Sequence, residues 1–448
     1  MLSQSAAQPS RGQQLHDRIA ALVPYHRSIT GEGVRQTLRD LREIVPLTIH
    51  EVPSGTRVFD WTVPREWAIR DAYIKDTDGR RIVDYRESPL HVVNSSVPVH
   101  ARMSLNDLRP NIHTRPDQPD VIPYRYAHYQ AGWGFCMRHR DFEAMPEGMY
   151  EVRIDSAFTD GSLTYGECCI PGASEREVLF SCHVCHPALA NDNLSGIAVA
   201  AELARTLMNR DLRYTYRFVF VPSTIGAITW LARNEHRTAR IDHGLVLSNL
   251  GDPGGLTYKV TRNGGTDIDR AMRHLFGYGD RPGTVRPFSP YGYDERQYNS
   301  PGFQLPVGLL TRTPHEGYPE YHTSADDLNL LTPEALEDSY DFIMEVVNLV
   351  ETNRTYLNTC PKGEPELGRR GLYRSVAGHS AGRTAELPHL WVLNLADGAH
   401  NLLHIAERAG LAYSLVEQAA SRLVEVGLLR EAVGAPPDGA APDRGMPP

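Results

Sequence analysis

Apolar runs that alternate with segments of helical spacing, between about residues 150 and 355, constrain the fold more than any other feature of this sequence. Val178–Ser181 precedes a predicted helix at Gly196–Met208, and Tyr216–Val221 precedes a second one at Ile225–Asn234. Apolar runs without polar alternation are typical of strands that are buried on both faces. Further expected elements are strands at Gly244–Ser248 and Pro306–Thr311 and a helix at Pro333–Asn353. The pattern therefore predicts an α/β sheet covered by helices.

Two other regions depart from this pattern. From residue 48 to about 140, short alternating runs separated by Pro, Gly, Asp and Asn predict a β-rich unit. Its expected strands are Thr56–Trp61, Trp67–Ile74, Arg81–Tyr85 and Leu90–Val93. Near the C-terminus, a strand, two helices joined by a turn at Gly410, and a wing predict a winged helix. These segments are Leu393–Leu395, Asn401–Ala409, Ser414–Val426 and Gly427–Leu429.

Composition excludes several classes of protein. The hydrophobic share of 41% permits a sizeable core, and 46 cationic against 55 anionic residues argue against a chain built to bind nucleic acid or an anionic membrane. No apolar run reaches the roughly 18 residues that a membrane span needs. Residues 1–14 lack the apolar stretch of a secretory signal. We therefore expect a cytoplasmic protein with reduced cysteines and with flexible tails at 1–14 and 433–448.

The densest group of polar residues lies between the first predicted strand and its helix. It reads Ser181-Cys182-His183-Val184-Cys185-His186-Pro187, followed by Asn191-Asp192-Asn193-Leu194-Ser195-Gly196. Sites in open α/β sheets form at the carboxyl ends of the strands. A neutral imidazole and a carboxylate, here His186 and Asp192, are plausible zinc ligands. The alternative for Asp192 is a role in capping the helix that follows.

The same stretch contains the pattern Cys-His-Val-Cys-His, which is found at haem c attachment sites. Haem attachment requires export, and no export signal is seen. A redox Cys-x-x-Cys motif usually opens a helix, whereas this one continues a strand. We therefore favour small buried thiols for Cys182 and Cys185.

Three further polar segments follow other elements of the predicted sheet. Asp252 comes after strand 244–248 and is a candidate ligand or orienting residue. Residues 291–297, Tyr-Gly-Tyr-Asp-Glu-Arg-Gln, lie in a loop rich in Pro and Gly, and residues 319–327 follow strand 306–311. Several such segments, each with His or acidic residues past a strand end, favour one shared site.

Zinc hydrolysis needs about three protein ligands, an open position, a base and a group that stabilises the oxyanion. The sequence offers His186, Asp192 and His322 as ligands. Either Glu295 or Asp294 can serve as the base. The residues that can hold the oxyanion or a substrate carboxylate are Arg296, Tyr293 and Tyr321.

Several long motifs carry a resemblance to a known family. They read HRSITGEGVRQTL, EVPSGTRVFDWTVPREW, SPLHVVNSSVPV, CHPALANDNLSG, VPSTIGAITWL, SPYGYDERQYNSPGF and PEYHTSADDL. Over about residues 20–430 the chain resembles bacterial aminopeptidase-like proteins, whose central domain is similar to the zinc aminopeptidases with a phosphorylase/hydrolase-like α/β/α fold. The resemblance implies a zinc aminopeptidase-like α/β domain at 15–47 and 141–358. It also implies an inserted β-rich domain at 48–140, which would wall the site, and a winged-helix domain at 365–432.

The resemblance also implies a ligand set. His186, Asp192 and His322 would be the zinc ligands, and Asp252 would lie near a second ligand set in a two-metal site. Zinc aminopeptidases carry an adjacent Glu pair after the next strand, where this chain reads Pro-Ser-Thr-Ile-Gly at 222–226. Relatives often have Glu at the position of Ser223. This departure leaves one zinc ion expected and the second doubtful, and it moves the expected base to Glu295.

The resulting expectation is a zinc-dependent hydrolase that cleaves an amide bond of a small peptide or aminoacyl conjugate. Family resemblance suggests a role in polysaccharide or natural-product biosynthesis. The alternative is a catalytically degenerate, peptidase-like binding or scaffold protein, which Ser223 favours. A third hypothesis is a regulator that acts through the winged helix, but Glu417 and Glu425 against Arg422 on its second helix oppose DNA binding. A homo-oligomer is left open.

Overall fold

The structure is a computed structural model that describes residues 9–279, 281, 283–315, 317–372 and 380–432. The chain forms two compact units, Met1–Asn263 with Val285–Asp341 and Gly264–Thr284 with Phe342–Pro448. The division falls within helix α9 (Pro333–Thr352). Among the described residues, we find no helix with the length and apolarity that crossing a bilayer requires.

The first unit is built on an eight-stranded mixed sheet of order β1-β10-β12-β11-β13-β16-β14-β15. Strands β12, β11, β13 and β16 are parallel to one another at its centre. Their bounds are Thr215–Val221, Glu177–His183, Ile241–Leu247 and Val307–Thr311. The two edge strands are β1 (Thr48–Pro53) and β15 (Gly283–Arg286), and the strands next to them are β10 (Ser162–Ile170) and β14 (Leu256–Lys259). The predicted α/β class is confirmed.

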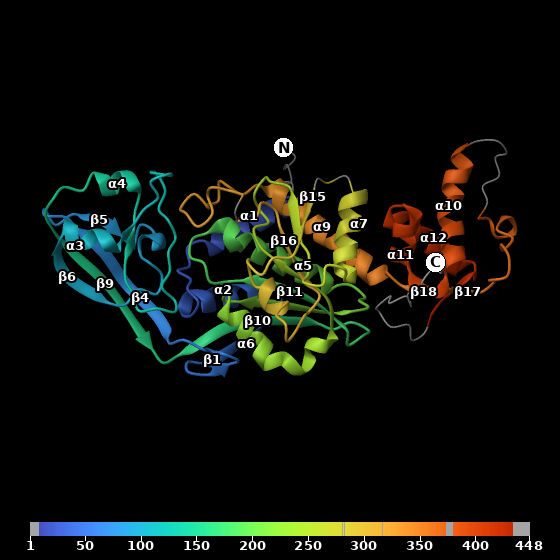
Figure 1. The fold of residues 1–448 in the computed structure, drawn as a ribbon, viewed down its shortest axis with the longest axis horizontal. Helices are drawn as coiled ribbons and strands as arrows, with labels where there is room; N and C mark the ends of the chain where they lie inside the picture. The colour runs from blue at the N-terminus through green and yellow to red at the C-terminus, as the bar shows by residue number, and fades with distance from the viewer. Residues whose placement is uncertain (1–8, 280, 282, 316, 373–379, 433–448) are drawn as a thin grey trace, which may run out of the picture. The chain divides into compact units, whose positions relative to one another are not determined.

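Helices cover both faces of this sheet, which explains why its central strands are mostly apolar. The side chains of β11 alternate between the two faces: Ser181 accepts a hydrogen bond from Tyr298 of α8 (Glu295–Tyr298), whereas the Cys182 thiol donates to Gly196 of α5 (Gly196–Leu207). Helix α6 (Ile225–Asn234) packs on the α8 side, and α1 (Arg11–Leu22) packs beside α5 (Figure 1). Helix α2 (Glu32–Arg42) lies against β10.

The bounds of the β-rich unit, as strand pairing gives them, differ from the expected range 48–140. Its four-stranded sheet has the order β5-β4-β9-β6, with β9 at Met149–Thr159 beyond the expected end. Strand β1 pairs with β10 and so belongs to the large sheet. The other strands are β4 (Glu66–Lys75), β5 (Arg81–Asp84) and β6 (Val99–Ser104), with the short pairs β2–β3 (Arg57–Val58, Trp61–Thr62) and β7–β8 (Ile112–His113, Phe135–Cys136). The expected strand Leu90–Val93 overlaps a 3₁₀ turn at Pro89–His91.

The short helices of this unit are α3 (Leu105–Leu108) and α4 (His139–Glu143). At the N-terminus, the Ser10 hydroxyl accepts a hydrogen bond from the Gln13 amide and caps α1, which begins at Arg11. The prediction of a tail over 1–14 is therefore wrong for residues 11–14. Residues 1–8 and 433–448 lie outside the described part of the chain.

The second unit contains a winged helix. Its three-stranded sheet has the order β18-β17-β19, and Gly410 adopts φ 63° in the turn between α11 and α12, as the sequence predicts. The elements are α7 (Asp267–Tyr278), β17 (Thr355–Asn358), α10 (Ser380–Leu395), β18 (Asp397–Asn401), α11 (Leu402–Ala409), α12 (Tyr413–Glu425) and β19 (Leu429–Glu431). The predicted strand Leu393–Leu395 is wrong, since these residues form the last turn of α10. Periodicity cannot separate so short an apolar run from a buried helix.

Acid sensitivity is expected from His243 on β13, which is 6% exposed. Burial lowers the pKa of His243 to about 3, whereas an unfolded histidine titrates near about 6.5. The folded state therefore binds fewer protons, and stability present above pH 6.5 is lost as the pH falls toward 3, by up to about 1.4 kcal/mol per pH unit. Urea unfolding at pH 7.5 and 5.0 should show a smaller loss for His243→Leu than for the wild type. Equal losses would contradict this assignment.

Candidate metal centre

The candidate site lies at the carboxyl ends of the four parallel strands. His183 is the last residue of β11, and Ser223 follows β12. Asn249 follows β13, and His322 lies in the loop after β16. The carboxyl ends of parallel strands meet at one edge of a sheet, and this edge is where α/β proteins form their sites. Segments far apart in the sequence are brought together here.

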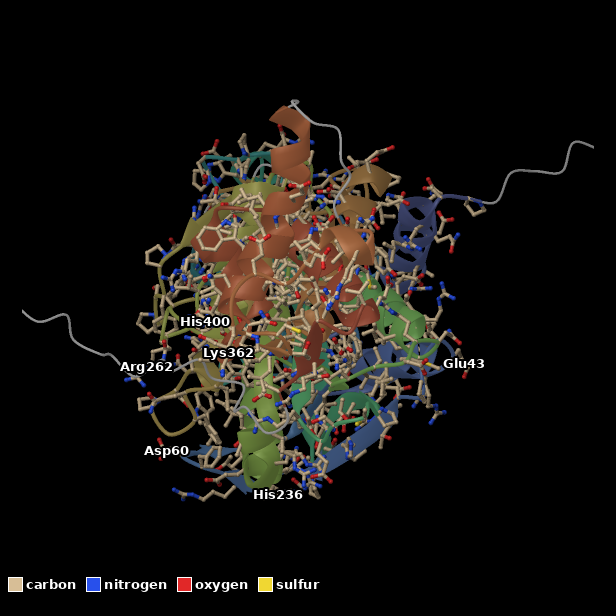
Figure 2. The ribbon with its side chains drawn as sticks, turned by 90° about the vertical axis from the view of Figure 1, so that its right-hand side faces the viewer. Glu43, Asp60, His236, Arg262, Lys362 and His400 are labelled. Carbon is tan, nitrogen blue, oxygen red and sulfur yellow. The ribbon has the colours of Figure 1, made fainter. Side chains whose placement is uncertain are left out.

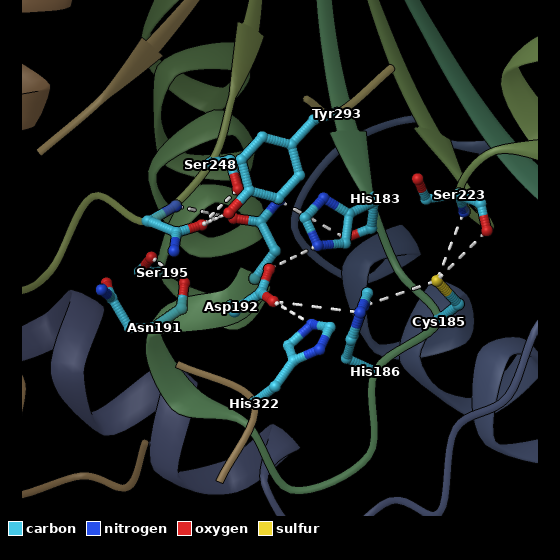
Figure 3. A network of polar contacts seen from close by, with 12 residues as sticks. His183, Cys185, His186, Asn191, Asp192, Ser195, Ser223, Ser248, Tyr293 and His322 are labelled. Carbon is cyan, nitrogen blue, oxygen red and sulfur yellow. Dashed lines mark hydrogen bonds and ion pairs between the residues drawn. The ribbon is translucent and has the colours of Figure 1, made fainter. Parts of the chain in front are cut away.

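Three imidazoles surround the carboxylate of Asp192 (Figure 3). The Nε2 atom of His183 lies 2.7 Å from Asp192 Oδ1. The Nε2 atoms of His322 and His186 lie 3.1 Å and 3.9 Å from Asp192 Oδ2. The structure thus brings together His186, Asp192 and His322, which the sequence offered as ligands, and it adds His183.

The chemistry of this cluster fits a metal ion. Ligand atoms of His183, His186 and Asp192 lie within 4.8 Å of one another. Asp192 Oδ2 and His322 Nε2 are buried, their 3.1 Å contact lacks the geometry of a hydrogen bond, and neither atom has another hydrogen-bond partner among the described residues. Nitrogen and carboxylate oxygen donors are those that zinc prefers in catalytic sites. A divalent cation would satisfy both of these buried atoms.

Protonation states also suit metal binding. Burial lowers the pKa of His186 well below its ordinary value, an effect that the opposing charge of Asp192 does not cancel. Burial raises the pKa of Asp192, but electrostatic attraction to the imidazoles of His186 and His183 has a larger effect in the opposite direction. The pKa of Asp192 therefore lies well below its usual range. A neutral imidazole and an ionised carboxylate are the forms that bind metals.

Asp252 bonds to the segment that carries Asp192. Its Oδ2 atom accepts a hydrogen bond from Asn191 Nδ2 at 3.1 Å, and its Oδ1 atom accepts from the Thr313 hydroxyl at 2.5 Å. Asp326 accepts from the backbone amides of Asn191 and Asp192 at 2.6 and 3.1 Å. Of the two roles that the sequence left open for Asp252, the geometry fits orientation of the segment that carries Asp192.

Two tyrosines hold the imidazole planes. Tyr293 stacks on His183 with ring centroids 5.3 Å apart, and its hydroxyl donates to Asn249 Oδ1 at 3.1 Å. Tyr321 stacks on His322 with centroids 4.0 Å apart. Each stacking contact restricts the plane that the imidazole ring can adopt. The Tyr293 hydroxyl donates its proton to Asn249 and not to a group in the cavity. The contacts of Tyr293 therefore fit a role in orienting His183 rather than the expected role in holding an oxyanion.

The backbone of His322 is held by the β-rich unit. His322 has a φ of 53°, a conformation that few non-glycine residues adopt. Its carbonyl accepts a hydrogen bond from the Tyr124 amide at 2.7 Å. The adjacent Ile122 amide donates to the Ser324 hydroxyl at 3.0 Å, and Pro123 forms a bridge with Thr323. This pairing fixes the loop that carries His322.

The two candidate bases have different surroundings. Asp294 is fully buried, its Oδ1 atom accepts from the Ser223 hydroxyl at 3.0 Å, and its Oδ2 atom has no partner among the described residues. Burial raises the pKa of Asp294 to about 6. Glu295 instead pairs with Lys259, whose ammonium also donates to the Tyr291 carbonyl at 2.7 Å. Of the two candidate bases, Asp294 is the one that is linked to the cavity beside the metal cluster, through its hydrogen bond with Ser223.

A cavity of about 300 Å³ adjoins the cluster. His186 and His322 form part of its wall, together with Ser223 and Arg296. The β-rich unit contributes Tyr124, Tyr126, His128 and Tyr129. The remaining lining residues are Cys185, Thr224, Tyr291, Gly292, Tyr293, His315 and Tyr321.

The thiols of this region are free and buried, as the sequence favours. Burial raises the pKa of Cys185 to about 12, so the thiolate is not available near neutral pH. Its sulfur accepts a hydrogen bond from the Ser223 amide at 3.3 Å. These contacts are those of packing residues rather than of redox or haem-binding residues.

Sequence reasoning missed two residues of this region. His183 ends an apolar run, and only its spacing of three residues from His186 could have marked it. Arg27 of the HRSITGEG motif is fully buried and donates to the carbonyls of His186 and Leu22 at 2.8 and 2.7 Å. Arg27 thereby joins an early motif to the backbone of a candidate ligand.

Replacing Arg27 by Ala should lower the free energy of unfolding by about 2–4 kcal/mol, because two buried carbonyls lose a charged donor. Urea unfolding of the full chain measures this loss. Arg39→Ala is the matched control, since Arg39 pairs with Glu32 on the surface of α2 and its side chain is 44% exposed. A surface pair of this kind contributes about 0–1 kcal/mol. Similar losses in the two variants would contradict the role given to Arg27.

The fold is an α/β/α arrangement that resembles the fold of zinc aminopeptidases, and it is followed by a winged helix. Residues 16–353 match the model of a domain of unknown function, DUF4910, and residues 354–431 match a winged helix-turn-helix model. The chain belongs to the DUF4910 family of aminopeptidase-like proteins.

Relatives agree with this assignment. A Clostridium acetobutylicum protein, named for polysaccharide biosynthesis and an aminopeptidase-like domain, is 46% identical over 419 residues, which cover 94% of this chain and 96% of the relative. A crystal structure from C. acetobutylicum, named as that of a peptidase, has a TM-score of 0.89 at 44% identity and covers 94% of this chain and 96% of that one. A zinc aminopeptidase of Bacillus subtilis shares the fold, with a TM-score of 0.57 at 13% identity over 76% of this chain and 95% of that one.

Proposed function

We propose that this chain is a zinc-dependent hydrolase that cleaves an amide bond of a small peptide or aminoacyl conjugate. The observation that carries the proposal is the buried cluster around Asp192, which has unsatisfied ligand atoms and adjoins a 300 Å³ cavity. His186, Asp192 Oδ2 and His322 would hold the ion. His183 would orient Asp192, because its Nε2 atom is already bonded to Oδ1.

A bound zinc ion would supply a polarised carbonyl and a water of lowered pKa. The chain's own residues would move the proton. Ser223 Oγ would accept a proton from a water in the cavity while passing its own proton to Asp294 Oδ1. Asp294 would return the proton by the same route to the leaving amine. A base with a pKa of about 6 changes protonation close to neutral pH, as this role requires.

This proposal replaces Glu295 as base by Asp294 acting through Ser223. It also gives Ser223 a part in proton transfer, although its hydroxyl cannot act as a carboxylate base. The name of the C. acetobutylicum relative refers to polysaccharide biosynthesis. We extend that reference to this chain as a proposal of a dedicated small substrate in such a pathway.

Metal content and turnover test the proposal together. Purified protein should bind about one zinc ion per chain and hydrolyse at least one member of a panel of N-acylated and aminoacyl amides. A chelator should remove the activity, and zinc should restore it. A protein that binds no zinc, or that binds zinc and hydrolyses no amide, would contradict the proposal.

The second candidate is a binding or scaffold protein with a degenerate peptidase domain. Ser223, which stands where a carboxylate base was expected, is the observation that favours it. Zinc binding without any turnover would support this candidate. Turnover that is lost in a metal-site variant would exclude it.

A further inference from the structure

We propose that the substrate is an anionic amide without a free amino group, and that Arg296 binds its carboxylate or phosphate. This inference rests on the proposed hydrolase function and names the substrate class of the same site. It departs from an aminopeptidase in the strict sense, whose substrate presents a free ammonium group beside the bond that is cleaved.

The cavity has no acidic lining that could receive an ammonium group. Among the described residues, neither Asp nor Glu lines it, and Arg296 is the one lining residue with a permanent charge. The two acids of the same loop are engaged elsewhere, Asp294 by Ser223 and Glu295 by Lys259. An ammonium group that enters would lose its hydration without gaining a counter-charge, and this costs free energy.

The Arg296 side chain has no bonded counter-ion, although its charge opposes the rise in pKa that burial causes at the neighbouring Asp294 and Glu295. In the described part of the chain, no residue forms a hydrogen bond or ion pair with it, and its Nε atom is buried without a partner. Two arginines at low exposure are ion-paired, Arg217 with Glu167 and Glu177 and Arg312 with Asp338, whereas the buried Arg27 is bonded to backbone carbonyls. A guanidinium presents planar N–H donors that match a carboxylate or phosphate. The unpaired guanidinium at this cavity therefore points to an oxyanion as its ligand.

The remaining walls suit the uncharged body of such a substrate. The Tyr126, Tyr129 and Tyr291 side chains line the cavity and are exposed, at 54%, 47% and 67%. Aromatic side chains of this kind can contact a planar acyl group or a ring. A volume of about 300 Å³ is at the lower end for ligand sites, which suits a small molecule.

Matched amides of different charge test this inference on the zinc-loaded full chain. The probes are N-acetyl-L-alanine and N-acetylethanolamine phosphate as anions, N-acetyl-L-alaninamide as the neutral amide, and L-alaninamide as the cation. We expect kcat/KM for at least one anion to exceed that for the neutral and cationic amides by about 10- to 100-fold, as a charge-assisted contact allows. The two anions distinguish a carboxylate from a phosphate.

Variants of Arg296 link that preference to this side chain. Arg296→Gln should lose the preference for the anion over the neutral amide, and Arg296→Lys should keep part of it. Arg262→Gln is the matched control, because Arg262 lies on the surface (Figure 2). An anion preference that survives in Arg296→Gln would overturn the inference.

Failure of this inference is distinguishable from failure of the proposed function. Preferential hydrolysis of L-alaninamide would overturn the inference and leave the hydrolase in place. If no amide is hydrolysed, the proposed function fails, and calorimetric binding of N-acetyl-L-alanine and N-acetylethanolamine phosphate then decides the inference. Binding that Arg296→Gln weakens about 10-fold or more supports it, and absence of binding by both anions overturns it.

Discussion

Replacing Asp192 by Asn should strip zinc from the purified protein and lower its zinc affinity by more than about 100-fold, which is the upper end for residues that only support a ligand. All three imidazoles of the cluster contact this carboxylate, and the amide removes its charge. Metal analysis after dialysis measures the loss. Unfolding with and without zinc measures it independently, since zinc at about 1,000 times its Kd stabilises a folded protein by about 4.1 kcal/mol.

Two further variants serve as controls for the loss of zinc in Asp192→Asn. Asp60→Asn should bind zinc like the wild type, because the Asp60 side chain is 101% exposed (Figure 2). His183→Gln should weaken zinc binding by about 10- to 100-fold without abolishing it, as expected of a residue that orients a ligand. Complete loss of zinc in His183→Gln would make His183 a ligand. Zinc bound by Asp192→Asn with wild-type affinity would remove the metal centre.

Replacing Asp294 by Asn should lower kcat by about 10²–10⁴-fold while zinc remains bound, because general-base catalysis contributes about that much. Burial raises the pKa of Asp294 to about 6, and only the ionised form can accept a proton. In the wild type, kcat/KM should therefore fall as the pH drops below about 6. The variant should lack this acid limb in its pH–rate profile.

Neighbouring residues provide the controls for Asp294. Ser223→Ala should lower kcat by a similar factor, since the Ser223 hydroxyl links Asp294 to the cavity. Glu295→Gln should instead lower the free energy of unfolding, because it leaves the buried Lys259 ammonium without its carboxylate partner, and it should keep the acid limb. Loss of the acid limb in Glu295→Gln, with the limb intact in Asp294→Asn, would reverse the assignment of the base.

Much of the sheet could be predicted because burial on both faces leaves an unmistakable pattern. The helix Ile225–Asn234 and the strand Tyr216–Val221 were predicted to within one residue. The limits of the β-rich unit were not predictable in this way. Strand β9 belongs to one sheet and β10 to the other, yet only Asp160 and Gly161 separate them, and no change of composition marks the boundary.

The site was partly predictable for a related reason. Candidates past the ends of parallel strands converge because the strands end at one edge, and this applies to His186, Asp192 and His322. Pairings across the fold leave no local signal. The contact of Glu295 with Lys259, the engagement of Asp252 by Thr313, and the stacking of Tyr293 on His183 join distant segments, and side-chain type alone does not reveal them.

The hydrogen bond from Tyr124 to the His322 carbonyl has a consequence for how this architecture can diversify. The segment 124–129 lines the cavity and also holds the loop that carries His322. Deletion of the β-rich unit would therefore disturb the candidate metal centre. Insertions or deletions near Tyr124 would alter the room for the substrate and the position of His322 at the same time. Changes in substrate specificity should therefore arise by side-chain replacement at Tyr126 and Tyr129. Such replacements reshape the cavity wall and keep the backbone hydrogen bond between Tyr124 and His322.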